Sequence, residues 1–291
     1  MAISEGHVTA GTLEVGYLSA GDGPLVLCLH GFPDTAWGWR HLLPALADAG
    51  YRAVAPFMRG YAPTAIPTDG VYQTGALAQD AVALHDALGG DGDAVVIGHD
   101  WGAPAAYGAA VLAPDRWRSV VGAAVPPGGA MAQAFFDYDQ LRRSWYMFFF
   151  QHRLADLVVP MDDLAFIARL WEDWSPGYDA AEDLAHIRRS LGEPANLAAA
   201  LGYYRATLGD GPRDPALEPA QAATASMPPQ PLLYLHGIDD GCVGIDTVSG
   251  VGPSLTVGGS RAVAVDAAGH FLHLEQPEIV TALILDFLDG A

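Results

Sequence analysis

The sequence contains no lysine, and positive charge of any kind is scarce. All 14 of its basic residues are arginine, against 34 acidic residues, which gives a formal net charge of -20 at pH 7. Such a charge opposes binding to nucleic acid and to anionic membrane surfaces, because both are negatively charged. We therefore expect a small molecule, and neither nucleic acid nor a membrane, as the partner of this protein.

Cysteines and long apolar runs are also scarce. Cys28 and Cys242 are too few for a disulfide framework, which favours a reducing compartment. No apolar run approaches the roughly 20 residues that cross a bilayer, and residues 1–11 lack the basic and apolar segments of a signal peptide. We therefore expect a cytoplasmic protein. The composition leaves open whether it forms a homo-oligomer.

Apolar residues, by contrast, are abundant: they make up 51% of the chain and charged residues 16%, which is typical of a well-packed globular protein. Short apolar segments alternate with helical ones along most of the chain. This alternation predicts an α/β fold with a mostly parallel sheet and helices on both faces. The expected strands are residues 24–29, 51–57, 94–97, 117–125, 230–236 and 261–266, after a hairpin at 7–21, and the expected helices are 37–49, 74–88, 103–112 and 277–288.

The alternation stops after Pro127. Helical, aromatic-rich segments then follow without a strand pattern until Gln230. We expect residues 1–127 and 229–291 to form the core domain. Residues 128–228 are expected to form a helical lid, inserted between two strands of the core sheet.

The strand at 94–97 runs into a helix through Gly98-His99-Asp100-Trp101-Gly102. Glycines on both sides of a central residue suit a sharp turn from strand to helix, in which that residue carries the reactive group. Here the residue is Asp100. Its carboxylate would lie at a helix N-terminus, where free N–H groups favour negative charge. The pattern predicts that Asp100 is a nucleophile.

Two further polar residues follow later strands. Asp240 comes after the strand at 230–236, and His270 comes after the strand at 261–266. Nucleophile, acid and histidine therefore appear in the order that this type of hydrolytic site requires. Asp239 is a competing acid, although a turn role suits it as well. We expect Asp100, Asp240 and His270 to form a catalytic triad.

An aspartate nucleophile dictates a particular chemistry. The carboxylate is already ionised, so it attacks a tetrahedral carbon directly and forms an alkyl ester. His270 would then deprotonate a water molecule that hydrolyses the ester, while Asp240 orients the imidazole. Water attack creates an oxyanion that needs N–H donors. We expect the backbone N–H groups of Phe32 and Trp101 to supply them.

Three segments of the chain form a recognisable set together with Asp240 and His270: His30-Gly31-Phe32-Pro33, Trp37-Gly38-Trp39-Arg40 and Gly98-His99-Asp100-Trp101-Gly102. With this set, residues 28–152 and 230–275 resemble the epoxide hydrolases of the α/β-hydrolase superfamily. The resemblance implies an α/β-hydrolase fold and conversion of an epoxide and water into a vicinal diol, without a metal or cofactor.

In this family two lid tyrosines donate hydrogen bonds to the epoxide oxygen. Tyr146 matches the first, and Tyr204 matches the second, although Tyr203 could take its place. The residues that we expect to line the substrate pocket are Phe32, Pro33, Trp101 and Phe150. One loop departs from the family pattern, because Phe57 replaces an Asp and Ala62 replaces a Gly.

Two alternatives stay open. Haloalkane dehalogenases share the Asp and His chemistry, but they need N–H donors for halide, and Phe32 has no side-chain donor where an Asn is common. Trp145 and Trp171 could supply such a donor. A non-catalytic binding protein on the same fold is the second alternative, and product analysis would discriminate between them.

Overall fold

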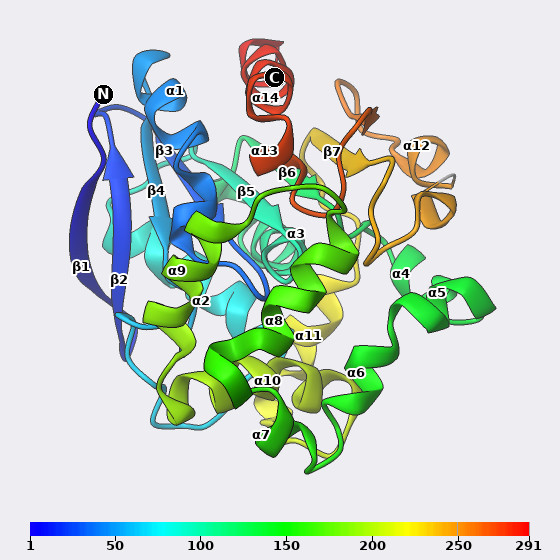
Figure 1. Ribbon diagram of the computed structural model, residues 1–291. Coiled ribbons are helices and arrows are strands. Elements are labelled where there is room, and N and C mark those ends of the chain that lie inside the picture. The colour runs from blue at the N-terminus through cyan, green and yellow to red at the C-terminus, as the bar shows by residue number, and fades with distance from the viewer. Residues whose placement is uncertain (249, 291) are drawn as a thin grey trace.

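The computed structural model describes residues 1–248 and 250–290, which fold around one sheet (Figure 1). Within this part of the chain the sheet has eight strands, in the order β1-β2-β4-β3-β5-β6-β7-β8. The strands are β1 (Ser4–Ala10), β2 (Leu13–Ala20), β3 (Leu25–Leu29), β4 (Arg52–Pro56), β5 (Val95–His99), β6 (Ser119–Ala123), β7 (Leu232–Gly237) and β8 (Arg261–Val265).

The sheet is mostly parallel. β1 and β2 form the expected hairpin, with Gly11 in its turn, and β2 also pairs antiparallel with β4. All the other pairings are parallel. Every residue of β3, β5, β6 and β7 is buried, as expected for strands covered on both faces.

Helices cover both faces of the sheet. On one face, α1 (Leu42–Asp48) packs against β4 and α14 (Pro277–Gly290) packs against β7. On the other face, α2 (Thr74–Ala87) and α3 (Gly102–Leu112) pack against each other and against strands. This arrangement confirms the predicted fold class. The short core elements are η1 (Ala36–Trp39), η2 (Pro114–Arg116), η4 (Ile245–Val248), α12 (Val251–Ser254) and α13 (Leu272–Glu275).

A helical segment connects β6 to β7 and lies in the front and lower part of Figure 1. It comprises α4 (Ala130–Ala134), α5 (Tyr138–Arg143), α6 (Trp145–Phe149), α7 (Ala155–Val158), α8 (Met161–Trp174), α9 (Ala181–Leu191), α10 (Pro194–Leu208), η3 (Pro215–Leu217) and α11 (Glu218–Thr224). Its last helix, α11, packs on α2 and α3 of the core. We propose that the lid ends before Glu218, and that α11 belongs to the core layer.

Among the described residues, no helix is both long enough and apolar enough to cross a membrane.

Candidate active site

Asp100 occupies the sharp turn between β5 and α3, with a φ of 51°. Residues other than glycine rarely adopt this left-handed backbone conformation. Where they do, they are often found at functional sites. The flanking glycines allow the close packing that the turn needs. A Cβ on Gly98 would lie 2.0 Å from the Gly102 oxygen, and a Cβ on Gly102 would lie 2.2 Å from the Leu29 oxygen.

The two carboxylate oxygens of Asp100 have different surroundings. Oδ1 accepts a hydrogen bond of 2.7 Å from the backbone N–H of Phe32. Oδ2 lies 3.6 Å from Nε2 of His270. Asp100 is 5% exposed and His270 is fully buried. One carboxylate oxygen of Asp100 is therefore already stabilised by an N–H group, and the other faces His270.

His270 contacts Asp240 through its other ring nitrogen. Nδ1 lies 3.0 Å from Asp240 Oδ2. The second oxygen of Asp240 accepts hydrogen bonds from the backbone N–H groups of Cys242 and Val243, at 2.7 and 2.8 Å. Asp239, the competing acid, is exposed instead. The structure thus brings together Asp100, His270 and Asp240 from three separate strand ends.

The two carboxylates control the charge of His270. Burial by itself lowers the pKa of this imidazole, but the charge of Asp240 and the contacts with Asp100 and Asp240 outweigh it and raise the pKa to about 10. The resting enzyme at neutral pH therefore carries His270 as an imidazolium between two carboxylates.

The raised pKa of His270 predicts that the free energy of unfolding depends on pH. The folded protein binds a proton at His270 that the unfolded chain releases above about pH 6.5. The stabilisation is therefore fully present below about pH 6.5 and is lost as the pH rises towards 10. We expect the free energy of unfolding to fall between pH 7 and 10 more steeply in the wild type than in His270→Gln. Urea titrations at a series of pH values measure this difference, and parallel curves would contradict it.

The two expected lid tyrosines lie close to each other and near Asp100. Tyr146 comes from α6 and Tyr204 from α10, and both are fully buried. Their ring centroids are 5.6 Å apart. Tyr204 also packs against Phe32, Trp101 and Phe150, with centroid distances of 5.3, 5.0 and 5.1 Å. Apart from Pro33, the residues expected to line a pocket therefore form one aromatic cluster around Asp100.

Tyr203 and Tyr204 point in different directions. The Tyr203 hydroxyl donates a 2.7 Å hydrogen bond to the backbone oxygen of Arg59. The Tyr204 hydroxyl is buried and makes no hydrogen bond to any residue that the structure describes. Burial raises the pKa of Tyr204 well above its usual range, and the charge of Asp100 adds to the effect. Tyr204 therefore offers a protonated donor, whereas Tyr203 has already used its proton.

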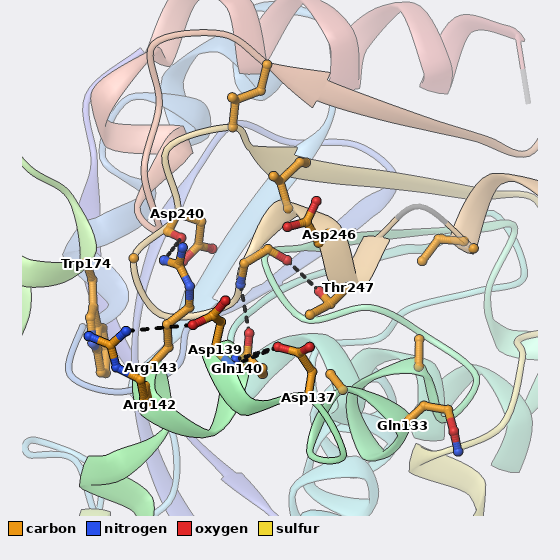
Figure 2. Close-up of a pocket in the computed structure, with 18 of the residues that line it drawn as sticks. Gln133, Asp137, Asp139, Gln140, Arg142, Arg143, Trp174, Asp240, Asp246 and Thr247 are labelled. Carbon is orange, nitrogen blue, oxygen red and sulfur yellow. Dashed lines mark hydrogen bonds and ion pairs between the residues drawn. The ribbon is translucent and has the colours of Figure 1, made fainter.

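Sequence reasoning missed the contacts that hold the segment 240–244, which we call the acid loop (Figure 2). Two residues of α5 clamp this loop. Arg143 donates to the Asp240 backbone oxygen at 3.0 Å. Gln140 donates to the Cys242 oxygen and accepts from the Gly244 N–H, both at 2.9 Å. These partners lie about a hundred residues apart in sequence, so no local pattern marks them.

An open cleft of about 1370 Å³ lies beside the acid loop, between it and α4–α5 (Figure 2). Asp240 and Trp174 line one wall, but Asp100, Tyr146 and Tyr204 do not. The cleft therefore reaches Asp240 but not Asp100 or the two tyrosines. Because the aromatic cluster is almost fully buried, we infer that the lid must move for substrate to reach Asp100.

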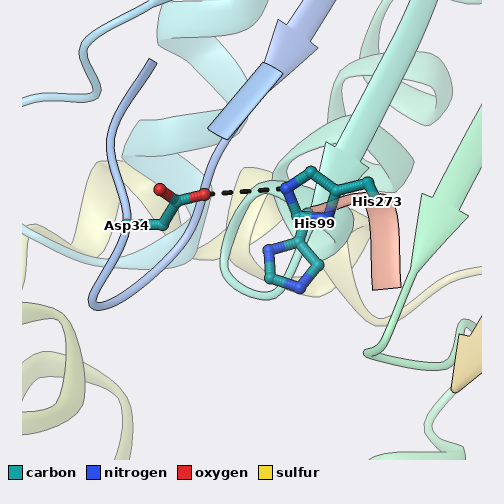
Figure 3. Close-up of side chains that lie close together, drawn as sticks. All are labelled: Asp34, His99 and His273. Atoms are coloured by element: carbon teal, nitrogen blue, oxygen red, sulfur yellow. Dashed lines mark ion pairs between the residues drawn. The ribbon is translucent and has the colours of Figure 1, made fainter. Parts of the chain in front are cut away.

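Asp34, His99 and His273 form a second buried cluster (Figure 3). One atom from each lies within 4.8 Å of the other two, a set that could hold a metal ion. Burial lowers the pKa of His273 to about 3 and raises that of Asp34 to about 7. The His99 ring is 4.9 Å from that of His270. A divalent cation here would add positive charge beside an imidazolium, so we assign no metal to this cluster.

The loop that departs from the family pattern is nevertheless well anchored. Arg59 pairs with Asp80, and its Nε lies 2.6 Å from Oδ2 of Asp80. Thr64 donates to the backbone oxygen of Phe57 at 2.6 Å. Phe57 itself is buried in the core. An apolar residue at 57 is therefore accommodated without opening this loop.

Comparisons with known proteins show the family to which the chain belongs. Residues 24–277 match the family model described as alpha/beta hydrolase fold. Epoxide hydrolase A of Mycobacterium tuberculosis is 31% identical, over 92% of this chain and 91% of its own.

Solved structures give the same result. Epoxide Hydrolase A from Mycobacterium thermoresistibile superimposes with a TM-score of 0.81 at 29% identity, covering 99% of both chains. An epoxide hydrolase from an endophytic Streptomyces gives 0.76 at 27% identity, covering 99% of this chain and 96% of that one. The chain belongs to the α/β-hydrolase family, among its epoxide hydrolases.

Proposed function

We propose that this protein hydrolyses an epoxide to a vicinal diol through an ester on Asp100. The observation that carries the proposal is the position of two buried hydroxyl groups, on Tyr146 and Tyr204, in one aromatic cluster with the carboxylate. An epoxide needs both parts, because a nucleophile must attack carbon while donors stabilise the oxygen that is released.

In the first step Oδ2 of Asp100 attacks a ring carbon of the epoxide. The C–O bond breaks, and its electron pair stays on the former ring oxygen, which remains part of the substrate. Tyr146 and Tyr204 donate hydrogen bonds to this oxygen as negative charge develops there. Their buried hydroxyls remain protonated at neutral pH, because burial raises the pKa of both. This step leaves an alkyl ester on Asp100.

In the second step water hydrolyses the ester. Esterification removes the negative charge of Asp100, which is one of the groups that raise the pKa of His270. The pKa of His270 therefore falls when the ester forms, and the imidazolium releases its proton, which balances the proton that the substrate alkoxide takes up to become a hydroxyl. The neutral imidazole can then take a proton from the attacking water, and cleavage of the ester releases the diol and restores the Asp100 carboxylate. The charge that develops on Oδ1 is stabilised by the N–H of Phe32, with the N–H of Trp101 as the expected second donor.

Haloalkane dehalogenation is the less favourable alternative. A leaving halide needs N–H donors beside the nucleophile. The buried Trp101 indole N–H makes no hydrogen bond among the described residues and is one such donor, but the residues expected to supply a second donor do not offer one. Phe32 has no side-chain donor, and the indole of Trp171 already donates to the Pro33 oxygen at 3.0 Å. The experiment that tests the assignment is product analysis with aliphatic and aromatic epoxides and haloalkanes. Diol supports our proposal, whereas halide release or ligand recovered unchanged contradicts it.

The tyrosines allow a quantitative prediction. Losing one donor of this kind costs about 3 kcal/mol, so Tyr146→Phe and Tyr204→Phe should each slow ester formation roughly a hundredfold. Ester hydrolysis should change little, because neither hydroxyl touches the attacking water. Single-turnover kinetics, with ester followed by intact mass, separates the two steps.

The chain offers a matched control, Tyr203→Phe, which removes a hydroxyl bonded to Arg59 rather than one in the aromatic cluster. It should form ester at the wild-type rate. If the Tyr146 and Tyr204 variants do so as well, the tyrosines only pack, and the epoxide assignment loses its main support.

Location and assembly remain proposals. The two cysteines are free and buried, which is compatible with a cytoplasmic location. Exposed apolar side chains on the lid, such as Phe136 and Leu157, would suit self-association.

A further inference from the structure

Cys242 is a free thiol inside the site, and the mechanism above does not use it. Its Sγ lies 3.3 Å from the Tyr146 hydroxyl, and the residue is 1% exposed. Asp240, two residues earlier, is the partner of His270. Cys242 therefore lies between Tyr146, the proposed donor to the epoxide oxygen, and Asp240, the partner of His270.

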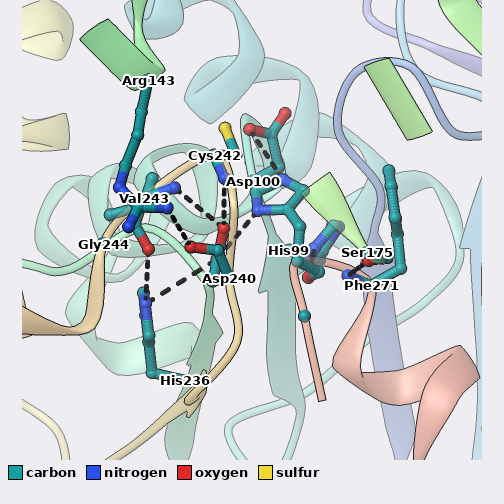
Figure 4. A network of polar contacts seen from close by, with 12 residues as sticks. His99, Asp100, Arg143, Ser175, His236, Asp240, Cys242, Val243, Gly244 and Phe271 are labelled. Carbon is teal, nitrogen blue, oxygen red and sulfur yellow. Dashed lines mark hydrogen bonds and ion pairs between the residues drawn. The ribbon is translucent and has the colours of Figure 1, made fainter. Parts of the chain in front are cut away.

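The backbone of Cys242 is held from both sides. Its N–H donates to Asp240 Oδ1 at 2.7 Å (Figure 4). Its carbonyl accepts from Gln140 at 2.9 Å. Gln140 lies on α5, and Tyr146 follows on α6. The acid loop and the helix that carries the tyrosine are thus joined, so the distance between sulfur and hydroxyl is set by the fold.

The thiol is a donor rather than a competing nucleophile. Burial raises the pKa of Cys242 well above its ordinary value, and the charges of Asp240 and Asp100 raise it further. The sulfur therefore keeps its proton at neutral pH, and a thiol attacks carbon far more slowly than a thiolate. An electrophilic substrate can bind beside it without alkylating it.

We propose that Cys242 is a positioning residue that holds the Tyr146 hydroxyl in the orientation from which it donates to the epoxide oxygen. The inference rests on the proposed function. Once Tyr146 gives its proton to a substrate hydrogen bond, its oxygen can only accept, and the S–H of Cys242 is the neighbouring donor. A hydrogen bond received by the tyrosine strengthens the one it donates.

The test is single-turnover ester formation and decay in Cys242 variants, with an epoxide that the wild type turns over. Cys242→Ala and Cys242→Val should slow ester formation about fivefold, which corresponds to about 1 kcal/mol. Cys242→Ser should stay within about twofold of the wild type, because its O–H also donates. Ester hydrolysis should not change, because Asp240 is held by the backbone N–H of residue 242. Cys28→Ala, which removes the other buried thiol, from β3, should leave both steps unchanged.

A double-mutant cycle distinguishes positioning from packing. In a Tyr146→Phe background, Cys242→Ala should have no further effect. In a Tyr204→Phe background, Cys242→Ala should still slow ester formation about fivefold, because the sulfur contacts Tyr146 and not Tyr204. An effect that persists without the Tyr146 hydroxyl, or that appears in ester hydrolysis, overturns the inference. Wild type that forms no ester with any epoxide overturns the proposed function instead, and the inference with it.

Discussion

Asp100→Asn is expected to abolish diol formation, lowering turnover by at least about 10⁴-fold. The amide is neutral and a poor nucleophile, so no ester can form. The fold should survive, because asparagine tolerates the left-handed conformation at this position and its oxygen can still accept from the Phe32 N–H. The measurements are diol production, intact mass after mixing with epoxide, and circular dichroism.

Asp239→Asn is a matched control, since it makes the same chemical change at an exposed carboxylate. It should keep wild-type turnover. The Asp100→Asn variant must also be checked by mass spectrometry for deamidation back to aspartate. If the pure variant, free of such deamidation, forms diol at an appreciable rate, Asp100 is not the nucleophile.

His270→Gln should separate the two steps of the reaction. Glutamine cannot take a proton from water, so ester hydrolysis should slow by roughly 10³-fold. Ester formation needs no base, so the variant should react once and stop. Intact mass should then show the enzyme plus one epoxide, whereas the wild type should show the adduct only transiently.

His7→Gln, at a histidine of the β1–β2 hairpin, serves as the control and should turn over normally. Absence of an adduct in His270→Gln would mean that the histidine is needed before ester formation. The proposed role of His270 would then be wrong.

The proximity of Asp100, Asp240 and His270 can be predicted because each residue follows a strand that the sequence marks clearly. An apolar run ends a few residues before each of Asp100, Asp240 and His270, and parallel strands bring their carboxyl ends to one edge of the sheet. The choice between Asp239 and Asp240 is harder, because both belong to the same turn. Only the three-dimensional path of the loop exposes the first and buries the second.

The lid residues are less accessible to sequence reasoning. Tyr203 and Tyr204 are neighbours on one helix, and both are buried, so spacing alone cannot separate their hydroxyls. Nothing in the sequence except its residue type indicates a role for Cys242, because its partner Tyr146 lies 96 residues away. Contacts between distant segments have no period that a single sequence could reveal.

The clamp between α5 and the acid loop has a consequence for protein engineering. Gln140 and Arg143 lie in the segment that a designer would exchange to change substrate range, yet they hold the loop whose Asp240 carboxylate contacts His270. Grafting a relative's lid onto this core would therefore disturb catalysis as well as specificity. A chimera should inherit residues 140–143 and 240–244 from the same parent, as one transplanted unit.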